Sequence, residues 1–374
     1  MNLALTDEQE FLREAARGAL SRVETVKAAR DALEGGELPD LWPTAVEAGW
    51  PGLLVDEEHG GAGLGAFDAM LVVQECGRVL APVALLGLLP ASALLQAAGD
   101  EALEAVAADK LRPTWLPTRP PGDLIGSWTV DARVGKHRAP APSAVADGDA
   151  VTFTGEVAWV PDAPGADLLV VVGVDEAAAP VVGAVAASEA RVEAVTRYDA
   201  TRSLAHVTLD GAAGRRLTVT DEQLSRAWYL AQALLAAESL GAVEATLEMA
   251  VQYAKERFTF GRAIGSYQAI KHGLTEVLRR QENSRSLLYY AGWAFDDRRD
   301  QFALAASAAR SAAGAALDFA ARQNITTHGG IAATWEHDAP LFFRRAQLTR
   351  RLAGGTAGAT DRVATEVLAA AAAA

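Results

Sequence analysis

The sequence contains a single cysteine, Cys76, among 374 residues. One cysteine cannot form an internal disulfide, and it cannot build a thiolate metal site by itself. No stretch of about 20 residues is both uncharged and wholly apolar, which argues against a membrane-spanning helix. The first ten residues have neither a basic start nor an apolar segment, so they do not resemble a secretion signal. We therefore expect a cytoplasmic protein without a membrane span.

Positive charge is also scarce, because 34 Lys and Arg face 48 Asp and Glu and the formal net charge is −14. Binding to a nucleic acid backbone needs clustered Lys and Arg, so this balance argues against a nucleic acid partner. Half of the residues are apolar, which favours a large folded core over disorder. The length favours two or three domains of roughly 100–200 residues each.

The local patterns divide the chain into three parts. Residues 1–118 are predicted to be helical, beginning with the capping signal Thr6-Asp7-Glu8-Gln9. Pro120-Pro121-Gly122 marks a boundary, and residues 119–218 carry short β-rich runs separated by turn residues, which predict a small barrel or sandwich. Residues 219–374 return to long Ala- and Leu-rich helical segments. The expected fold class is α+β, with an N-terminal helical domain, a small middle β-barrel and a C-terminal helical bundle.

The expected elements follow the same three parts. The helices are predicted near residues 39–48, 66–79, 89–108, 221–257, 266–294, 301–326, 338–352 and 359–370, in addition to the first one. The strands are predicted at 124–130, 150–153, 168–174, 181–185, 205–209 and 216–219. The glycine-rich segment 57–65 follows no strand and lacks a Gly-Lys-Ser/Thr ending, so we interpret it as a connection between helices.

The most informative segment is Arg257-Phe-Thr-Phe-Gly-Arg-Ala-Ile-Gly-Ser-Tyr-Gln268, where one long helix ends and the next begins. The planar fork of Arg257 can pair with a phosphate. Phe260 can cover the edge of an aromatic base, and Gln268 in the first turn of the next helix can hydrogen-bond to a nucleotide. The same pattern also fits a plain helix hairpin with a surface arginine.

This segment closely resembles the signature of the acyl-CoA dehydrogenase family, with Arg, Phe-Gly, Ile and Gln in register. The opening residues 5–13, the glycine-rich loop and residues 328–338 are similar to the same family, including its actinobacterial branch with heterotetrameric members. The resemblance implies that FAD lies between the β domain and the C-terminal helices, partly held by a neighbouring subunit. It assigns Arg257, Phe260, Gln268, Gly329 and Gly330 to FAD, since glycines let a ligand approach the backbone closely. The family has Gln where this chain has Thr326.

The implied reaction is α,β-desaturation of an acyl-CoA thioester, with electrons passed on to an electron-transfer acceptor. A carboxylate removes the α-proton, which requires a raised pKa and a dry site. Family members carry this base directly before a Gly-Thr pair or 26 residues before the signature Arg. Those positions are Gly354 and Ala231 here, and neither can accept a proton.

Two other family features are also missing. The motif Thr-Glu-Pro-x-x-Gly-Ser-Asp, which lies against the flavin, has no counterpart in the run that begins Ser127-Trp-Thr-Val-Asp. The Trp-Ile-Thr run, whose Thr lies near flavin N5, is Trp159-Val160-Pro161 here. Proline has neither a hydroxyl nor a backbone N–H to donate.

Glu238 is the remaining candidate base. It lies in an otherwise apolar helical stretch, seven residues after Ala231 and therefore on the same helix face, roughly 10 Å further along. A carboxylate there is costly unless it is paired or protonated. It is either a relocated base or a structural carboxylate bonded inside the bundle or facing solvent. The cluster Thr334–Asp338 holds one His between two acids, and without a second ligand at metal spacing we expect no metal site.

These features favour an acyl-CoA dehydrogenase subunit, in a homo- or heterotetramer with a related subunit, whose retained residues complete the FAD site of a partner. One alternative is a self-sufficient homotetramer that uses Glu238. Others are a flavin-free, CoA-binding or scaffold protein and a flavin N-hydroxylase on the same fold.

Overall fold

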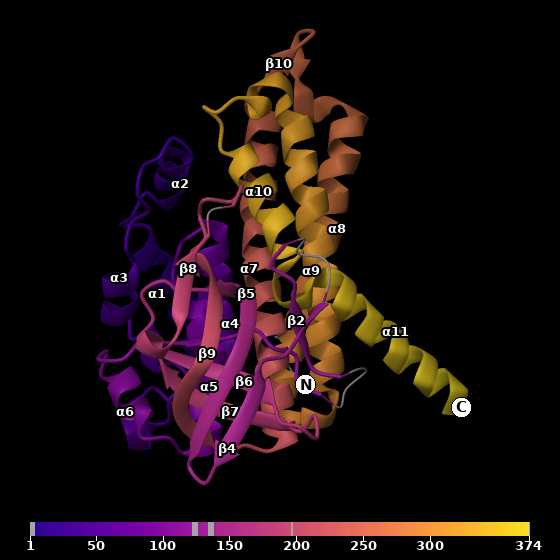
Figure 1. Cartoon of the computed structure of the whole chain (residues 1–374). Helices are drawn as coiled ribbons and strands as arrows, with labels where there is room; N and C mark the ends of the chain where they lie inside the picture. The colour runs from indigo at the N-terminus through magenta and orange to yellow at the C-terminus, as the bar shows by residue number, and fades with distance from the viewer. Residues whose placement is uncertain (1–3, 122–125, 134–137, 196, 374) are drawn as a thin grey trace.

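The computed structural model describes residues 4–121, 126–133, 138–195 and 197–373. It contains N-terminal helices, a middle β domain and a C-terminal helical bundle, as Figure 1 shows. This arrangement confirms the α+β fold class expected from the sequence. Among the described residues, no helix is both long and apolar enough to cross a membrane.

The N-terminal part is helical. Its helices are α1 (Asp7–Leu20), α2 (Thr25–Leu33), α3 (Trp42–Glu47), α4 (Ala66–Arg78), α5 (Leu85–Ala98) and α6 (Ala102–Ala107). Thr6 and Gln9 form the expected reciprocal cap on α1, since each side chain accepts a hydrogen bond from the backbone N–H of the other. The prediction of a single helix over residues 89–108 is wrong. Gly99 has φ +63, the left-handed conformation that ends a helix, and the chain therefore forms α5 and α6 separately.

The middle domain is a small barrel. Its strands are β1 (Pro113–Trp115), β4 (Ser143–Asp147), β5 (Ala150–Pro161), β6 (Leu168–Val174), β7 (Pro180–Ala186), β8 (Arg191–Ala194) and β9 (Leu204–Leu217), and β2 (Trp128–Val130) and β3 (Arg138–Pro140) form a separate hairpin. The sheet runs β1-β6-β4-β5-β9-β7, and a further β6–β7 pairing closes it. Strand β1 lies within residues 1–118, so the prediction that this whole part is helical is wrong at its end. Strand β9 ends at Leu217, next to the predicted boundary at residue 218.

Several strand predictions for this domain differ from the structure. The predicted strand 150–153 continues to Pro161 in β5, and β3, β4 and β8 lie where no strand was predicted. The segments 205–209 and 216–219 were expected to be separate strands. Instead β9 covers the first and reaches Leu217 of the second, because Gly211 absorbs the interruption as a bulge where the register with β5 shifts. The predicted strand 124–130 begins with two residues outside the described range, and β2 covers its last three.

The C-terminal part is built on one central helix. Its helices are α7 (Asp221–Glu256), α8 (Gln268–Asp297), α9 (Arg299–His328), α10 (Ala339–Thr349) and α11 (Gly355–Ala373), and the hairpin β10 (Phe258–Thr259) and β11 (Arg262–Ala263) joins α7 to α8. Helix α11 leaves the body of the molecule at an angle (Figure 1). Most residues of α7 between Leu224 and Thr246 are buried, so this helix is enclosed by its neighbours.

Helices α4 and α7 approach each other closely. A Cβ atom at Gly241 would lie 1.8 Å from the carbonyl oxygen of Gln74, and one at Gly77 would lie 2.1 Å from the carbonyl oxygen of Glu238. Only glycine permits this backbone contact. The contact fixes α7 against the N-terminal domain at the level of Glu238.

Candidate functional site

The helix corner proposed to hold FAD lies at the far end of the bundle, beside the β10 label in Figure 1. Phe260 and Gly261 form its two-residue turn with φ +49 and +77, as tight hairpin turns require. The Phe260 side chain is 93% exposed, and Arg257 and Gln268 are exposed as well. The backbone N–H of Arg257 donates to the Tyr253 carbonyl at 2.8 Å, which ends α7 cleanly before the hairpin.

The glycine pair lies at the same end of the bundle. His328, directly before Gly329, packs its ring 4.2 Å from the ring of Tyr253, which is one helical turn before Arg257. Gly329 has φ +68, and a Cβ at Gly329 or Gly330 would meet nothing within 4 Å. The fold thus brings the five predicted FAD residues to one end of the bundle, with the glycine backbone open to an incoming molecule.

This end of the bundle also exposes large apolar side chains. They are Phe258, Phe260, Ile331 and Trp335, and Trp335 is 69% exposed. A cluster of exposed aromatic side chains is typical of a surface that another molecule covers. We call these four residues, together with Arg257 and Gln268, the nucleotide-end surface.

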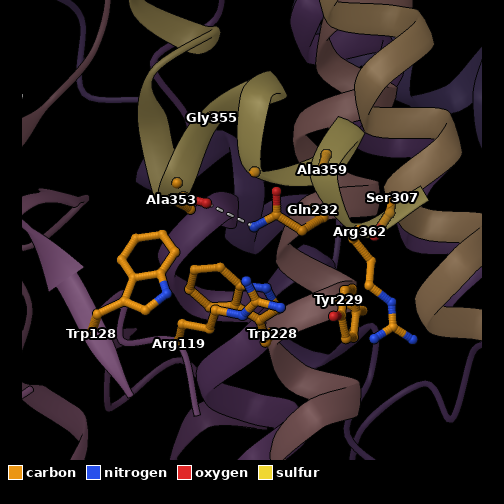
Figure 2. A pocket seen from close by; sticks show the side chains of 12 residues that line it. Arg119, Trp128, Trp228, Tyr229, Gln232, Ser307, Ala353, Gly355, Ala359 and Arg362 are labelled. Atoms are coloured by element: carbon orange, nitrogen blue, oxygen red, sulfur yellow. Dashed lines mark hydrogen bonds between the residues drawn. The ribbon is translucent and has the colours of Figure 1, made fainter. Parts of the chain in front are cut away.

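A second place of interest is an interior cavity lined by Gly354, at one family base position, and by Gln232, the neighbour of Ala231 at the other (Figure 2). Gln232, next to Ala231, donates its amide to the carbonyl oxygen of Ala353 at 3.1 Å, directly before Gly354. The cavity measures about 10 Å³, which is room for about one water. Its walls are formed by Arg119, Trp128, Trp228, Tyr229, Gln232, Ser307, Ala353, Gly354, Gly355, Gly358, Ala359 and Arg362. No carboxylate is among these described lining residues.

The aromatic residues of this cavity were missed by sequence reasoning. Trp228 lies three residues before Ala231 and therefore on the same helix face, and this spacing is a signal that its indole covers the empty alanine position. Trp128 and Trp115 both pack edge-on against Trp228, with ring centroids 5.9 and 5.8 Å away. Large side chains thus occupy the interior where the family holds its reacting groups.

Trp159, the residue of the family's Trp-Ile-Thr run, is also engaged within the chain. The guanidinium of Arg197 lies 3.9 Å from the centre of its ring, and His206 packs against it edge-on at 4.5 Å. The carbonyl of Pro161 accepts a hydrogen bond from the Thr114 hydroxyl at 2.9 Å. These contacts cover Trp159 with side chains of the same chain, and Pro161 supplies no donor.

A larger pocket of about 380 Å³ lies between the β2–β3 hairpin and the start of α11, at the boundary between the β domain and the C-terminal helices. Three arginines, Arg138, Arg350 and Arg351, and one acidic residue, Asp361, line it. Arg351 donates to the Tyr198 hydroxyl at 2.7 Å, and the Arg138 guanidinium lies 4.8 Å above the ring of Trp128. The pocket can attract an anion, but it ends at the tryptophan.

Glu238 lies in a buried ionic network. Glu238 is only 4% exposed. One of its carboxylate oxygens accepts a hydrogen bond from Arg345 at 2.9 Å, and the other accepts one from Arg202. Arg345 also donates to Asp199 at 2.8 Å. Burial opposes the charge of Arg345, yet Glu238 and Asp199 outweigh it and raise the pKa of Arg345. The network therefore joins α7, α10 and the loop before β9.

This geometry favours the structural interpretation of Glu238. Both of its oxygens are bound by guanidinium groups, which fix the carboxylate inside the ionic network. Glu238 does not line the cavity beside Gly354. It also lies 19 residues before Arg257 along α7, roughly 28 Å from the nucleotide-end surface.

The cluster Thr334–Asp338 is held by contacts within the protein. The ring of His337 packs 4.3 Å from that of His328, and Asp338 pairs with Arg30 of α2. Among the described residues, no group of three or more His, Cys, Asp or Glu side chains could hold a metal ion.

The order of a helical domain, a small β domain and a helical bundle (Figure 1) is that of the acyl-CoA dehydrogenase fold. Comparisons agree with this fold. Residues 6–118 match the acyl-CoA dehydrogenase N-terminal domain, and residues 225–368 match the acyl-CoA dehydrogenase C-terminal domain. The chain is 30% identical to acyl-CoA dehydrogenase IpdE2 of Mycolicibacterium smegmatis, over 97% of this chain and 100% of that one. It is 31% identical to IpdE2 of Mycobacterium tuberculosis, over 96% of this chain and 98% of that one.

Solved structures share the fold. The ChsE4-ChsE5 complex from Mycobacterium tuberculosis superposes with a TM-score of 0.85 at 24% identity, over 98% of this chain and 99% of that one. A variant of the Tcur3481-Tcur3483 steroid ACAD has the same TM-score of 0.85 at 27% identity, over 98% of this chain and 99% of that one. The chain belongs to the acyl-CoA dehydrogenase family, an FAD-dependent family of oxidoreductases.

Proposed function

We propose that the chain is one subunit of a heteromeric acyl-CoA dehydrogenase and completes the nucleotide end of an FAD site whose flavin ring lies in a partner subunit. The supporting observation is the contrast between the two ends of α7. The nucleotide-end surface is open and has the family residues, whereas the interior is filled by tryptophans and has no carboxylate at either base position.

The nucleotide-end surface fits the adenosine and pyrophosphate part of FAD. Arg257 offers a bidentate fork to a phosphate, and Phe260 offers an exposed ring to the adenine. Gln268 adds an amide, and the open backbone at Gly329 and Gly330 allows close approach. When bound, FAD supplies the acceptor for the β-hydride of the acyl thioester. The residues of this chain bind and orient its nucleotide end.

The flavin-ring side of this chain does not fit the same group. Pro161 replaces the hydroxyl donor of the family, and Arg197 and His206 cover Trp159. Gly354 and Ala231 supply no base. We therefore derive no catalytic step inside this chain, and we place the desaturation of the acyl-CoA and the release of electrons to an acceptor in the partner.

The similar solved structures support a two-chain assembly and suggest a substrate class. Two of the similar solved structures are described as assemblies of two differently named chains, and one of these as a steroid ACAD. We propose the same type of two-chain assembly here, with a bulky, steroid-like acyl-CoA as the substrate class.

The test compares the chain purified alone with the chain co-expressed with a related dehydrogenase subunit. The chain alone should show little flavin absorbance and should not reduce FAD with an acyl-CoA, whereas the complex should contain flavin and turn over. Stoichiometric FAD and full turnover from the isolated chain would instead establish the self-sufficient homotetramer. Thermal stabilisation by acyl-CoA, without flavin in either preparation, would establish a CoA-binding or scaffold protein.

Substitutions in the complex then locate the contact. Arg257→Ala should reduce the flavin content of the complex, because it removes the phosphate partner. The matched control is Arg279→Ala, since Arg279 is also an exposed arginine of the bundle but pairs with Glu276 on its own helix. Equal flavin content in the two variants would contradict the assignment of Arg257.

A further inference from the structure

Trp128 on strand β2 separates two spaces inside the protein. Both the cavity of about 10 Å³ and the pocket of about 380 Å³ have Trp128, Gly354, Gly355 and Gly358 in their walls. The smaller space continues inward to Trp228, Tyr229 and Gln232, while the larger one opens past the arginines. The indole therefore lies in the wall that the two spaces share, and Figure 2 shows it at the edge of the smaller one.

The indole also occupies the space of a side chain at position 354. A Cβ atom on Gly354 would lie 2.6 Å from Cη2 of Trp128, and real Cβ atoms essentially never come so close to another atom. The ring cannot move aside easily, because it is 7% exposed and packs between Trp228 and Arg138. Many family members carry the catalytic carboxylate residue at this position. The indole therefore excludes such a side chain here, as well as any ligand group beside it.

No hydrogen bond of the Trp128 side chain among the described residues explains its buried position. Its indole nitrogen is buried and has no hydrogen-bond partner among the described residues. A buried donor without a partner is a cost, so the ring is held there by its shape and packing. The backbone of Trp128 pairs with Pro140 in the β2–β3 hairpin and with Arg119, which fixes the origin of the side chain.

We propose that Trp128 is a plug that closes the acyl thioester site of this chain, and that removal of its indole joins the outer pocket to the interior. The ligand that would then enter is an acyl-CoA thioester, with its phosphates at the arginines of the pocket and its acyl group inward. The choice of ligand depends on the proposed function, whereas the steric relation between Trp128 and Gly354 does not.

The first experiment measures ligand entry. Butyryl-CoA is titrated calorimetrically into the full-length chain and into Trp128→Ala, which should bind it at least about 10-fold more tightly than the unmodified protein. Trp115→Ala is the control, because Trp115 is also buried and also packs on Trp228 but lines neither space. Equal affinity in the folded Trp128→Ala, Trp115→Ala and unmodified proteins would overturn the proposal.

The second experiment measures the steric relation and needs neither ligand nor partner. Gly354 has φ +83, a backbone conformation that strains any side chain, so Gly354→Ala should lower the melting temperature in every background. The additional clash with the indole should make the decrease larger in the unmodified protein than in a Trp128→Ala or Trp128→Leu background. Gly355→Ala is the control, because its Cβ would meet the Arg350 carbonyl at 2.5 Å instead of the indole, so its effect should be the same in both backgrounds. If the effect of Gly354→Ala is also unchanged, Trp128 is not the plug. Trp128→Leu keeps this test available if the alanine variant does not fold.

These outcomes can be told apart from a failure of the proposed function. If the effect of Gly354→Ala does not depend on the residue at position 128, Trp128 is not the plug, whether or not the chain has a partner subunit. If that dependence is found but Trp128→Ala does not bind butyryl-CoA, the acyl thioester is not the ligand of the opened site. The flavin content of the complex tests the proposed function separately from both results.

Discussion

Replacing Glu238 by alanine tests how the centre of the fold is held together. Glu238 is the shared partner of Arg202 and Arg345, and these three residues are almost completely buried. The substitution leaves Arg202 without its carboxylate and leaves Arg345 with Asp199 alone. Two guanidinium groups would then have to share one negative charge away from water.

The expected loss is large. Removing one partner of a buried ion pair costs about 3–5 kcal/mol, because the remaining charge stays desolvated. Native domains are stable by only about 5–15 kcal/mol, so this loss is a large fraction of the total. Glu238→Gln keeps the shape of the side chain and one acceptor oxygen, and it should lose less.

Urea denaturation followed by circular dichroism measures this free energy of unfolding. Glu276→Ala is the control, since Glu276 also binds two arginines but does so on the surface of α8, and it should lose far less. A loss below about 1 kcal/mol in Glu238→Ala would refute the reasoning, because a buried pair cannot be broken so cheaply. In the co-expressed complex, turnover should survive Glu238→Gln. If turnover disappears while flavin content and stability are kept, Glu238 is the base.

Three further results are expected. Burial raises the pKa of Asp162 to about 6, so the native state binds a proton more readily than the unfolded chain; its contribution to stability is present at pH below about 4 and lost as pH rises through about 6, a change of about 3 kcal/mol that should vanish from denaturation curves of Asp162→Asn. Gly241→Ala should lower the free energy of unfolding by about 1–3 kcal/mol in the same assay, because the new methyl group would lie 1.8 Å from the Gln74 carbonyl oxygen and force α4 away from α7. Gly18→Ala is the control and should cause no such loss, because its methyl group would have no neighbour within 4 Å. Phe260→Ala should leave the melting temperature of the isolated chain unchanged, because the ring is 93% exposed, but should weaken flavin retention in the complex; an unchanged flavin content would remove Phe260 from the site.

Several elements followed from local sequence alone because the responsible interactions are local. The cap at Thr6 and Gln9 and strand β6 over residues 168–174 were predicted as the structure has them. Short elements such as α2, β1, β3, β4 and β8 were not predicted, and two other errors occurred where one glycine changes the backbone direction. Gly99 ends a helix that the apolar pattern would continue, and Gly211 lets a strand pass an apparent break. The apolar pattern does not show the φ angle that a glycine adopts.

The candidate site shows the same division. Sequence motifs predict Arg257, Phe260, Gln268, Gly329 and Gly330 as FAD residues. Residue type alone shows that Gly354 and Ala231 cannot act as bases. The sequence left the role of Glu238 open. Its partners Arg202 and Arg345 lie 36 and 107 residues away along the chain, so only the packing of α10 and the barrel loop onto α7 shows that both carboxylate oxygens are paired.

The sequence by itself determined the family and the order of the three domains, since both depend on motifs and on composition. It also predicts the residues offered to a nucleotide, and residue type shows that neither Gly354 nor Ala231 can act as a base. What only the tertiary structure decided is that the interior is closed. Trp128 of the β domain, Trp228 of α7 and Gly354 before α11 are far apart in the sequence, and the indole of Trp128 fills the place of a side chain at position 354 only because the folded domains press these elements together.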